Sequence, residues 1–322
     1  MIRPLLRLPE ILLLGALVLS LSSPSNHVNA NDTYSTLNEE ELLQAYISLC
    51  SKTAPERIRS MQLLSSAERS HVWRLHLGMF LARHPALSRD QQSIVIEALL
   101  LSTSQMFGVP EPNNPSWRAQ VLEPIENLSR RGLQIFSRDD IAQIFSEIGS
   151  SQDLELLEKY AQFSQLRRGD RKVRFNQISP QERSDLWRVH LGLNLARHAE
   201  WTDQQRSIVL EAIGIASPSL YQIPKDKNWT RLVDEPIRLF AQRTLLVFSE
   251  QEVETLFAEL GADEPKAHHA RLTVDGNCSC SSVSTYCTYT CFSNDCTVLT
   301  WGCGTMMLYA CDGVCSRPQR QF

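Results

Sequence analysis

The feature that most constrains the fold of this 322-residue chain is an internal duplication. The segment "AERSHVWRLHLGMFLARHPALSRDQQSIVIEALL" (residues 67–100) recurs without a gap as "QERSDLWRVHLGLNLARHAEWTDQQRSIVLEAIG" (residues 181–214). Further along, "LEPIENL" and "FSRDDIAQIFSEIG" are matched by "DEPIRLF" and "FSEQEVETLFAELG". Similarity of this extent predicts a tandem duplication, with one copy at residues 31–150 and the other at residues 151–264.

Both copies have the residue pattern of α-helices. Trp73, Leu77 and Leu81 recur at intervals of four residues, which places them on one face of a helix. Pro85 is expected to end this helix, and Ser88 or Asp90 to cap the next one. Neither copy shows the alternation of β-branched residues that is typical of strands. The sequence therefore predicts a mainly α chain that contains two tandem helical repeat domains.

A motif rich in histidine, "WRxHLGxxLARH", occurs once in each copy. Its histidines are His76, His84, His190 and His198. The two histidines of each motif are eight residues apart, whereas a zinc pair on a helix is one turn apart, so a structural role is favoured over zinc binding. We expect the second histidine of each motif to bond the carbonyls at a helix end. Gly78 and Gly192 are expected to allow close contact between helices, and Trp73 and Trp187 to be buried.

Charged residues also recur between the copies. They are Arg74, Arg83, Arg188, Arg197, Glu97 and Glu211. Ion pairs within each domain are favoured over a surface that binds a partner. Cys50, in a helical run, is expected to be a small buried apolar residue and not a nucleophile. Because no phosphate-binding loop, nucleophile elbow or Cys–His pair is evident, the sequence predicts no catalytic residue and no cofactor.

The first 30 residues have the layout of a secretory signal peptide. Arg3 and Arg7 precede an apolar run at residues 11–21, and a polar stretch ends in small residues at Ala30. The apolar run is too short to span a bilayer. The sequence therefore predicts cleavage after Ala30 by the export machinery and a secreted protein, in a compartment where disulfides persist.

The C-terminal segment at residues 277–322 contains all but one of the nine cysteines. They are Cys278, Cys280, Cys287, Cys291, Cys296, Cys303, Cys311 and Cys315. A segment of this size cannot bury enough surface to fold without crosslinks, so a framework of disulfides is predicted. Zinc binding is the alternative, because two cysteine pairs have ligand spacing, but export counts against it. Eight cysteines allow 105 connectivities, among which the sequence does not choose. We expect short strands and turns in this tail, including a tight turn or a bulge at Gly302 and Gly304.

The tail follows a linker at residues 265–276 that is an expected site of proteolysis. The cleavage region is expected to contain Arg271, Asp275, Gly276 and Asn277. The most apolar part of the tail consists of Trp301, Met306, Met307, Leu308 and Tyr309. These side chains are expected either to contact a target or to form the small core of the tail.

The tail resembles the fulvocin C-related bacteriocin precursors. The similarity is carried by "NCSCS" (residues 277–281), by "YC" at Tyr286 and Cys287, by "GCGT" (residues 302–305) and by the aromatic residue in "LYAC" (residues 308–311). The interval between Cys287 and Cys291 is shorter than in that family, and "CDGVC" separates what is a close cysteine pair there. The resemblance covers about one-seventh of the chain.

The resemblance implies a secreted precursor whose helical pro-region releases a disulfide-stabilised antimicrobial peptide. Its expected partners are a processing protease and a target on the envelope of a susceptible cell. The net charge of −4 favours neither nucleic acid nor anionic lipid as a partner. The alternative is an exported binding module that stays uncleaved and recognises its partner through the tail. A further alternative is an exported enzyme that uses the histidine–arginine motif.

Overall fold

The computed structural model describes residues 39–108, 113–145, 148–261, 277–283, 290–292 and 296–316. The predicted signal peptide with Ala30, the linker residues Arg271, Asp275 and Gly276, and Cys287 lie outside these residues. The described residues form two compact units. One unit extends to Leu157 and includes Gly192–Glu200, and the other comprises Glu158–Leu191 and the chain from Trp201 onward.

The first copy of the duplication is helical. Its elements are α2 (Glu39–Cys50), α3 (Ala54–Leu63), α4 (Ser66–Arg83), α5 (Arg89–Leu101), α6 (Pro115–Trp117), the π-helical turn η1 (Arg118–Leu122), α7 (Glu123–Ile135) and α8 (Arg138–Phe145). Ser88 begins α5 with a capping box, in which its hydroxyl accepts from the Gln91 amide. The predicted end of the preceding helix before Pro85 is also confirmed, since α4 ends at Arg83.

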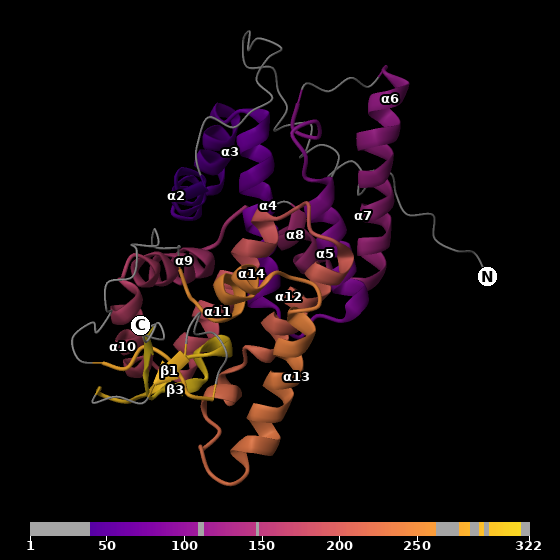
Figure 1. Ribbon diagram of the computed structural model, residues 1–322. Helices are drawn as coiled ribbons and strands as arrows, with labels where there is room; N and C mark the ends of the chain where they lie inside the picture. The colour runs from indigo at the N-terminus through magenta and orange to yellow at the C-terminus, as the bar shows by residue number, and fades with distance from the viewer. Residues whose placement is uncertain are drawn as a thin grey trace, which may run out of the picture. The chain divides into compact units, whose positions relative to one another are not determined.

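The second copy has corresponding elements in the same order (Figure 1). They are α9 (Ser151–Ser164), α10 (Arg168–Gln177), α11 (Pro180–Arg197), α12 (Asp203–Ile215), the 3₁₀ turn η2 (Pro218–Tyr221), the π-helical turn η3 (Thr230–Asp234), α13 (Glu235–Thr244) and α14 (Glu250–Phe257). The prediction of a mainly helical fold is therefore confirmed. Among the described helices, none has the length and apolarity needed to cross a bilayer.

A buried histidine connects the first and last helices of each copy to the central helix. The Tyr46 hydroxyl lies 3.3 Å from Nδ1 of His76, whose Nε2 is 2.8 Å from the carbonyl of Gln143. His190 makes the equivalent contacts, at 2.9 Å to the Tyr160 hydroxyl and 3.1 Å to the Thr255 carbonyl. Since a carbonyl can only accept, Nε2 of each ring carries a proton. Burial lowers the pKa of His76, which favours the neutral ring. These contacts support the structural role predicted for both histidines.

The glycines of the repeated motif pack against each other. A Cβ atom on Gly78 of α4 would lie 2.2 Å from the Gly192 carbonyl oxygen, and one on Gly192 would lie 2.5 Å from the Gly78 oxygen. Both glycines belong to the first compact unit. Glycine is therefore required because any side chain here would overlap a backbone carbonyl. The predicted close helix contact is confirmed, as is the burial of Trp73 and Trp187.

His84 and His198, the second histidines of the motif, differ in their contacts. His84 Nδ1 lies 2.8 Å from the Phe80 carbonyl at the end of α4, as predicted for a helix C-terminus. His198 Nδ1 lies 2.7 Å from the Glu200 carboxylate. That contact joins the ring to a side chain just beyond α11.

The recurrent glutamates form ion pairs within their own copies. Glu97 pairs with Arg131, and Glu211 lies 2.6 Å from Arg243. Arg83 pairs at 2.7 Å with Asp153, which lies in α9 but belongs to the same compact unit. Cys50 is a buried free thiol whose pKa is raised by desolvation to about 12, which agrees with the prediction that it is not a nucleophile.

The tail forms two short antiparallel strand pairs, in agreement with the predicted β/turn character. β1 (Thr290–Phe292) pairs with β4 (Val314–Ser316), and β2 (Leu299–Cys303) pairs with β3 (Tyr309–Cys311). A 3₁₀ turn, η4 (Thr305–Met307), lies between β2 and β3. The tail joins the second compact unit.

Among the described residues of the tail, three disulfides are formed. They are Cys278–Cys296, Cys280–Cys291 and Cys303–Cys311. The predicted disulfides are confirmed for these six cysteines, which are therefore not available as zinc ligands. The backbone of Cys315 lies opposite Cys291 in the β1–β4 ladder. Crosslinks of this kind are typical of proteins that mature in an oxidising compartment.

Replacing Gly78 by alanine should destabilise the first unit. The added methyl group overlaps the Gly192 carbonyl, so the helices must separate, at a cost of about 1–3 kcal/mol in the free energy of unfolding. Gly214, in α12, is the matched control, because a Cβ atom there meets nothing within 4 Å. Alanine at Gly214 should stabilise the chain by about 0.5–1 kcal/mol through helix propensity. Urea unfolding of the two variants measures both effects, and equal stabilities would contradict the close contact.

Candidate interaction site between the tail and the second repeat

The apolar stretch of the tail is covered in the folded chain. Met306, Met307, Leu308 and Tyr309 are each less than 9% exposed, and Trp301 is partly buried. The tail's own buried cluster is made chiefly of the cysteines Cys278, Cys303 and Cys311, with Cys296 and Leu299 packed against it. The contacts of Trp301 and Tyr309 are instead with side chains of the second repeat, within the same compact unit.

Trp301 of β2 is surrounded by four side chains of the second repeat. Its ring lies edge-on to Tyr221 and Trp229, with centroids 6.1 and 5.8 Å away. Arg183 and Lys225 supply cations at 5.3 and 4.0 Å from the ring centroid. Aromatic edges and cations both interact favourably with the electron-rich face of an indole. We call Tyr221, Trp229, Arg183 and Lys225 the Trp301 cage.

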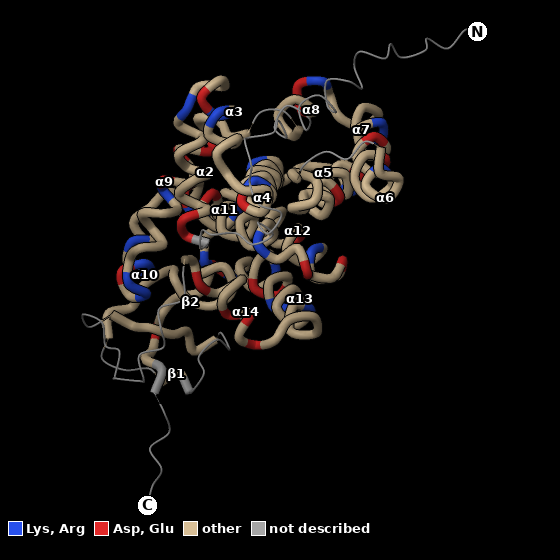
Figure 2. Tube along the Cα trace, turned by 90° about the horizontal axis from the view of Figure 1, so that it is seen from above, with Lys and Arg blue, Asp and Glu red and all other residues tan. Residues whose placement is uncertain are grey.

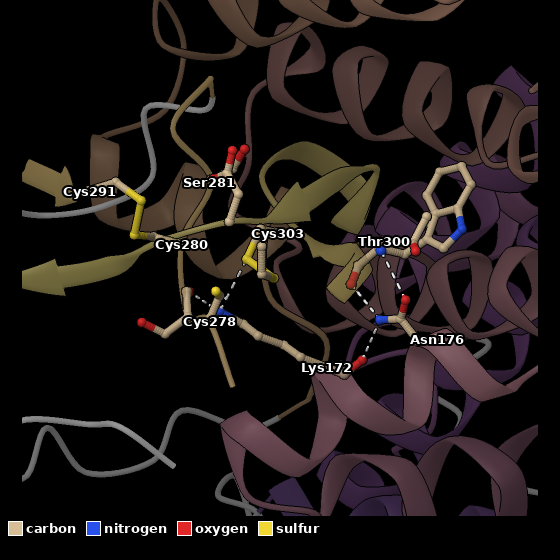
Figure 3. The surroundings of a disulfide bond; sticks show 12 residues. Lys172, Asn176, Cys278, Cys280, Ser281, Cys291, Thr300 and Cys303 are labelled. Atoms are coloured by element: carbon tan, nitrogen blue, oxygen red, sulfur yellow. Dashed lines mark hydrogen bonds between the residues drawn. A yellow bond between two sulfur atoms is a disulfide. The ribbon is translucent and has the colours of Figure 1, made fainter. Parts of the chain in front are cut away.

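Asn176 binds the backbone of the same tryptophan. The Trp301 amide donates to its Oδ1 at 3.0 Å, and its Nδ2 donates to the Trp301 carbonyl. The side chain of Asn176 thus pairs with both polar groups of one residue of β2, as a neighbouring strand would. Figure 3 shows Asn176 and Lys172 projecting from α10 toward the tail. Since α10 packs on β2, the helix aligns both side chains for this contact.

Arg183 binds the carbonyls at the end of α10. Its Nε and Nη2 donate to the carbonyls of Phe175 and Asn176, at 2.9 and 3.0 Å. These carbonyls lie in the last turn of α10, where helix carbonyls lack partners within the helix. The guanidinium also lies over the Phe175 ring, 5.4 Å from its centroid. One arginine thus completes the helix that carries Asn176 and contacts Trp301.

Further hydrogen bonds reach the tail from other parts of the second repeat. The Tyr309 hydroxyl donates to Asp234 at 3.0 Å, and the Tyr221 hydroxyl donates to the Met306 carbonyl at 3.4 Å. Lys225 donates to the Thr300 carbonyl. The surface that covers the tail is therefore built by α10, the start of α11, η2, η3 and the segment between η2 and η3.

Lys172 contributes an amino group that is enclosed by the tail. Its Nζ donates to the Ser279 carbonyl and lies 3.6 Å from Sγ of Cys303 (Figure 3). Desolvation lowers the pKa of Lys172 to about 7, and the nearby positive charge of Arg168 acts in the same direction. The carboxylate of Glu254 opposes this change only in part. Binding of the tail therefore favours the neutral amine.

Glycine allows β2 to approach α10. Gly302 has φ of +119°, and a Cβ atom on it would lie 3.2 Å from Cβ of Lys172. Met306 and Met307 also have positive φ, of +53° each, in the turn that follows. Gly302 lies within β2, where the register with β3 shifts as in a bulge, and Gly304 begins the turn η4, so the predicted turn or bulge is confirmed. The close approach adds a reason for glycine at position 302 that the sequence did not reveal.

The interface does not depend on opposite charges. Basic residues gather along α10, whereas the described strands of the tail are almost free of charge (Figure 2). Asp312 is the acidic residue of these tail segments, and it accepts from the Ser282 amide and hydroxyl within the tail. Aromatic contacts and hydrogen bonds to backbone groups therefore hold the tail, so their strength should change little with salt.

The sequence predicted the tail side of this site but not the helical side. Lys172, Asn176 and Tyr221 occupy positions where the first copy has Ile58, Gln62 and Phe107. Ile58, at the position equivalent to Lys172, is 43% exposed. A comparison of the two copies position by position would have marked these differences. The histidines of the repeated motif are not part of the site, and His76 and His190 are 1% and 2% exposed.

Comparisons of the chain with protein-family models, with curated proteins and with solved structures found no match. The geometry of the interface is thus the main guide to its role. In this geometry the disulfide-bonded tail packs its indole into an aromatic and cationic cage of the second repeat.

Replacing Asn176 by leucine should loosen the tail. The substitution keeps the side-chain volume but leaves the Trp301 amide and carbonyl without these partners, at a cost of about 2 kcal/mol or more. Hydrogen exchange at the Trp301 amide should accelerate at least about tenfold. Gln177→Leu is the matched control, because Gln177 is the exposed neighbour at the end of α10. Equal exchange in the two variants would show that Asn176 does not hold the tail.

Attachment of the tail should strengthen as pH rises from about 7 to about 9. The bound Lys172 has a pKa of about 7, against 10.5 when released, so release takes up a proton across this range. Attachment should become more favourable by up to about 1.4 kcal/mol per pH unit as the pH rises. Below pH 7 its strength should no longer change with pH. Lys225, with a pKa lowered to about 8, adds a smaller effect of the same sign because it is more exposed.

The measurement is hydrogen exchange at the Trp301 amide across this range, corrected for the intrinsic pH dependence of exchange. Lys172→Met should flatten the profile, and Lys225→Met should change it less. A profile that Lys172→Met leaves unaltered would contradict the role of the enclosed amine.

Proposed function

We propose that this chain is the secreted precursor of a bacteriocin-like antimicrobial peptide, in which the helical repeats cover the peptide until a protease cuts the linker. The observation that carries the proposal is the burial of the tail's apolar stretch. Among the side chains expected to contact a target, Trp301 packs in the cage and Tyr309 binds Asp234, while Met306, Met307 and Leu308 are buried. A surface that is covered in the precursor becomes available only after release.

The tail is built to keep its structure after a cut. Its three described disulfides all connect cysteines within the tail. Asn277 forms a bridge with Thr297, and the Cys278 amide donates to the Thr297 carbonyl at 3.0 Å. The described structure of the tail therefore begins at Asn277, so a cut in residues 265–276 would leave its strands and crosslinks intact.

The proposed role of the helical repeats is to cover and orient the peptide, without any chemical step. Their side chains supply the cage, the Asn176 amide and the Lys172 amine, and none of these contacts requires a cofactor. The near-neutral tail is proposed to act on a specific component of the cell envelope, since it lacks the positive charge by which many peptides bind anionic lipid.

One observation favours a second candidate function. The tail and the second repeat form one compact unit, as expected of an exported binding module that stays uncleaved. In that case the tail would be a fixed part of a larger recognition surface. The two candidates differ in whether the secreted protein is cut.

The intact mass of the secreted material separates these candidates. The precursor proposal expects a fragment that begins in or just after residues 265–276, whose gain in mass on reduction gives its number of disulfides. A single uncut chain without its first 30 residues would favour the binding module.

The killing of indicator cells tests the proposed activity. The released fragment should kill, whereas a chain with residues 265–276 replaced by a protease-resistant Gly–Ser segment should not. Killing of equal potency by the uncut chain would show that the helical repeats do not cover the active surface. A folded, released fragment that kills no cells from a broad panel would overturn the antimicrobial role.

A further inference from the structure

An exposed row of leucines distinguishes the second copy from the first. Leu232, Leu239 and Leu246 are spaced seven residues apart in η3, in α13 and just after α13. They are 49%, 60% and 83% exposed. Seven residues are close to two helical turns, so Leu239 and Leu246 fall near one face. Large apolar side chains at this exposure gather where a protein meets a partner.

The first copy serves as an internal comparison. Its residues at the three equivalent positions are Gln120, Asn127 and Gln134, and all three are exposed. The fold therefore requires only an exposed residue at each position. The neighbouring Glu235 and Arg243 are matched by Glu123 and Arg131, so the charges of this face are retained while its amides are replaced by leucines.

Two of these leucines, Leu239 and Leu246, border a groove between α12 and α13 of about 630 Å³. Leu239, Leu246, Pro236 and Ile215 give it an apolar lining, and the Glu211–Arg243 ion pair lies beside them. Pro236, Leu239 and Arg243 are three or four residues apart along α13, so they share the face that borders the groove. This is the shape and chemistry of a surface that takes the apolar side of another helix.

We propose that this face binds the same face of a second copy of the chain, with the two α13 helices antiparallel. Glu235 and Arg243 each lie four residues from Leu239, on opposite sides. A two-fold axis at Leu239 places Glu235 of one chain opposite the partner chain's Arg243, and the pairing occurs twice. The same axis brings the leucines of both chains together. Such a self-complementary patch is what an isologous dimer requires.

Charge balance supports a second copy over a charged partner. The face carries Glu211, Asp234 and Glu235 together with Arg238 and Arg243, so its net charge is only −1. Arg243 can contact a second carboxylate while it keeps Glu211, since its side chain is 54% exposed and has five N–H donors. The dimer also leaves the tail covered, because none of these residues belongs to the Trp301 cage.

Sedimentation velocity of the full oxidised chain, from about 1 to 200 μM, tests the proposal. The wild type should dimerise across this range. Leu239→Asn with Leu246→Gln, which installs the residues of the first copy, should raise the dissociation constant at least about tenfold. Leu63→Gln, at a leucine of α3 that is 87% exposed, is the control for loss of an exposed leucine and should leave the dimer intact.

The register has its own test. Glu235→Arg should weaken the dimer about tenfold because it places arginine opposite arginine, and adding Arg243→Glu should restore it. Glu123→Arg makes the same change in the first copy and should have no effect. A monomeric wild type at about 200 μM would overturn the proposal, as would a dimer that the leucine substitutions do not change. A monomer that binds neutral phosphatidylcholine vesicles through these leucines would likewise overturn it and indicate a lipid surface instead.

Discussion

The pairing of Asn176 with the backbone of Trp301 is the contact on which the arrangement of the tail depends. It fixes β2 against α10 and thereby places the indole among Tyr221, Trp229 and the two cations. The three described disulfides connect parts of the tail to one another and do not join it to the helices. Attachment therefore depends on an amide, an aromatic cage and a few backbone hydrogen bonds, all of which are reversible. A covalently crosslinked tail on a reversible support is what the proposed precursor would need in order to release its product.

Lys172 makes the strength of this attachment depend on pH. Its amine is desolvated beside Ser279 and Cys303, which lowers its pKa and favours the neutral form. Attachment thus includes the cost of removing a proton from a lysine at or above neutral pH. An apolar residue, as at Ile58 in the first copy, would avoid that cost. The lysine gives specificity for a carbonyl of the tail while it limits how tightly the tail is held.

Much of the fold follows from local sequence signals, whereas the interface does not. The duplication, the capping residue Ser88 and the glycines at the helix contact are local features, and the structure confirms what each predicts. The role of Asn176 depends on which residue of a distant strand lies opposite it, and no local pattern contains that information. The pairing of the cysteines was likewise open, because many connectivities are compatible with one spacing. The informative signal was the divergence between copies, at Lys172 and Asn176 on one surface and at Leu239 on another.

The central claim is that noncovalent contacts hold a self-contained tail on the second repeat. Native mass spectrometry of the oxidised chain, after a single cut at an engineered protease site within residues 265–276, tests it directly. The two fragments should remain together as one complex at pH 8, and Trp301→Ala should separate them, since it empties the cage. Immediate separation of the wild-type fragments would contradict the claim, because it would show that only the linker keeps the tail in place.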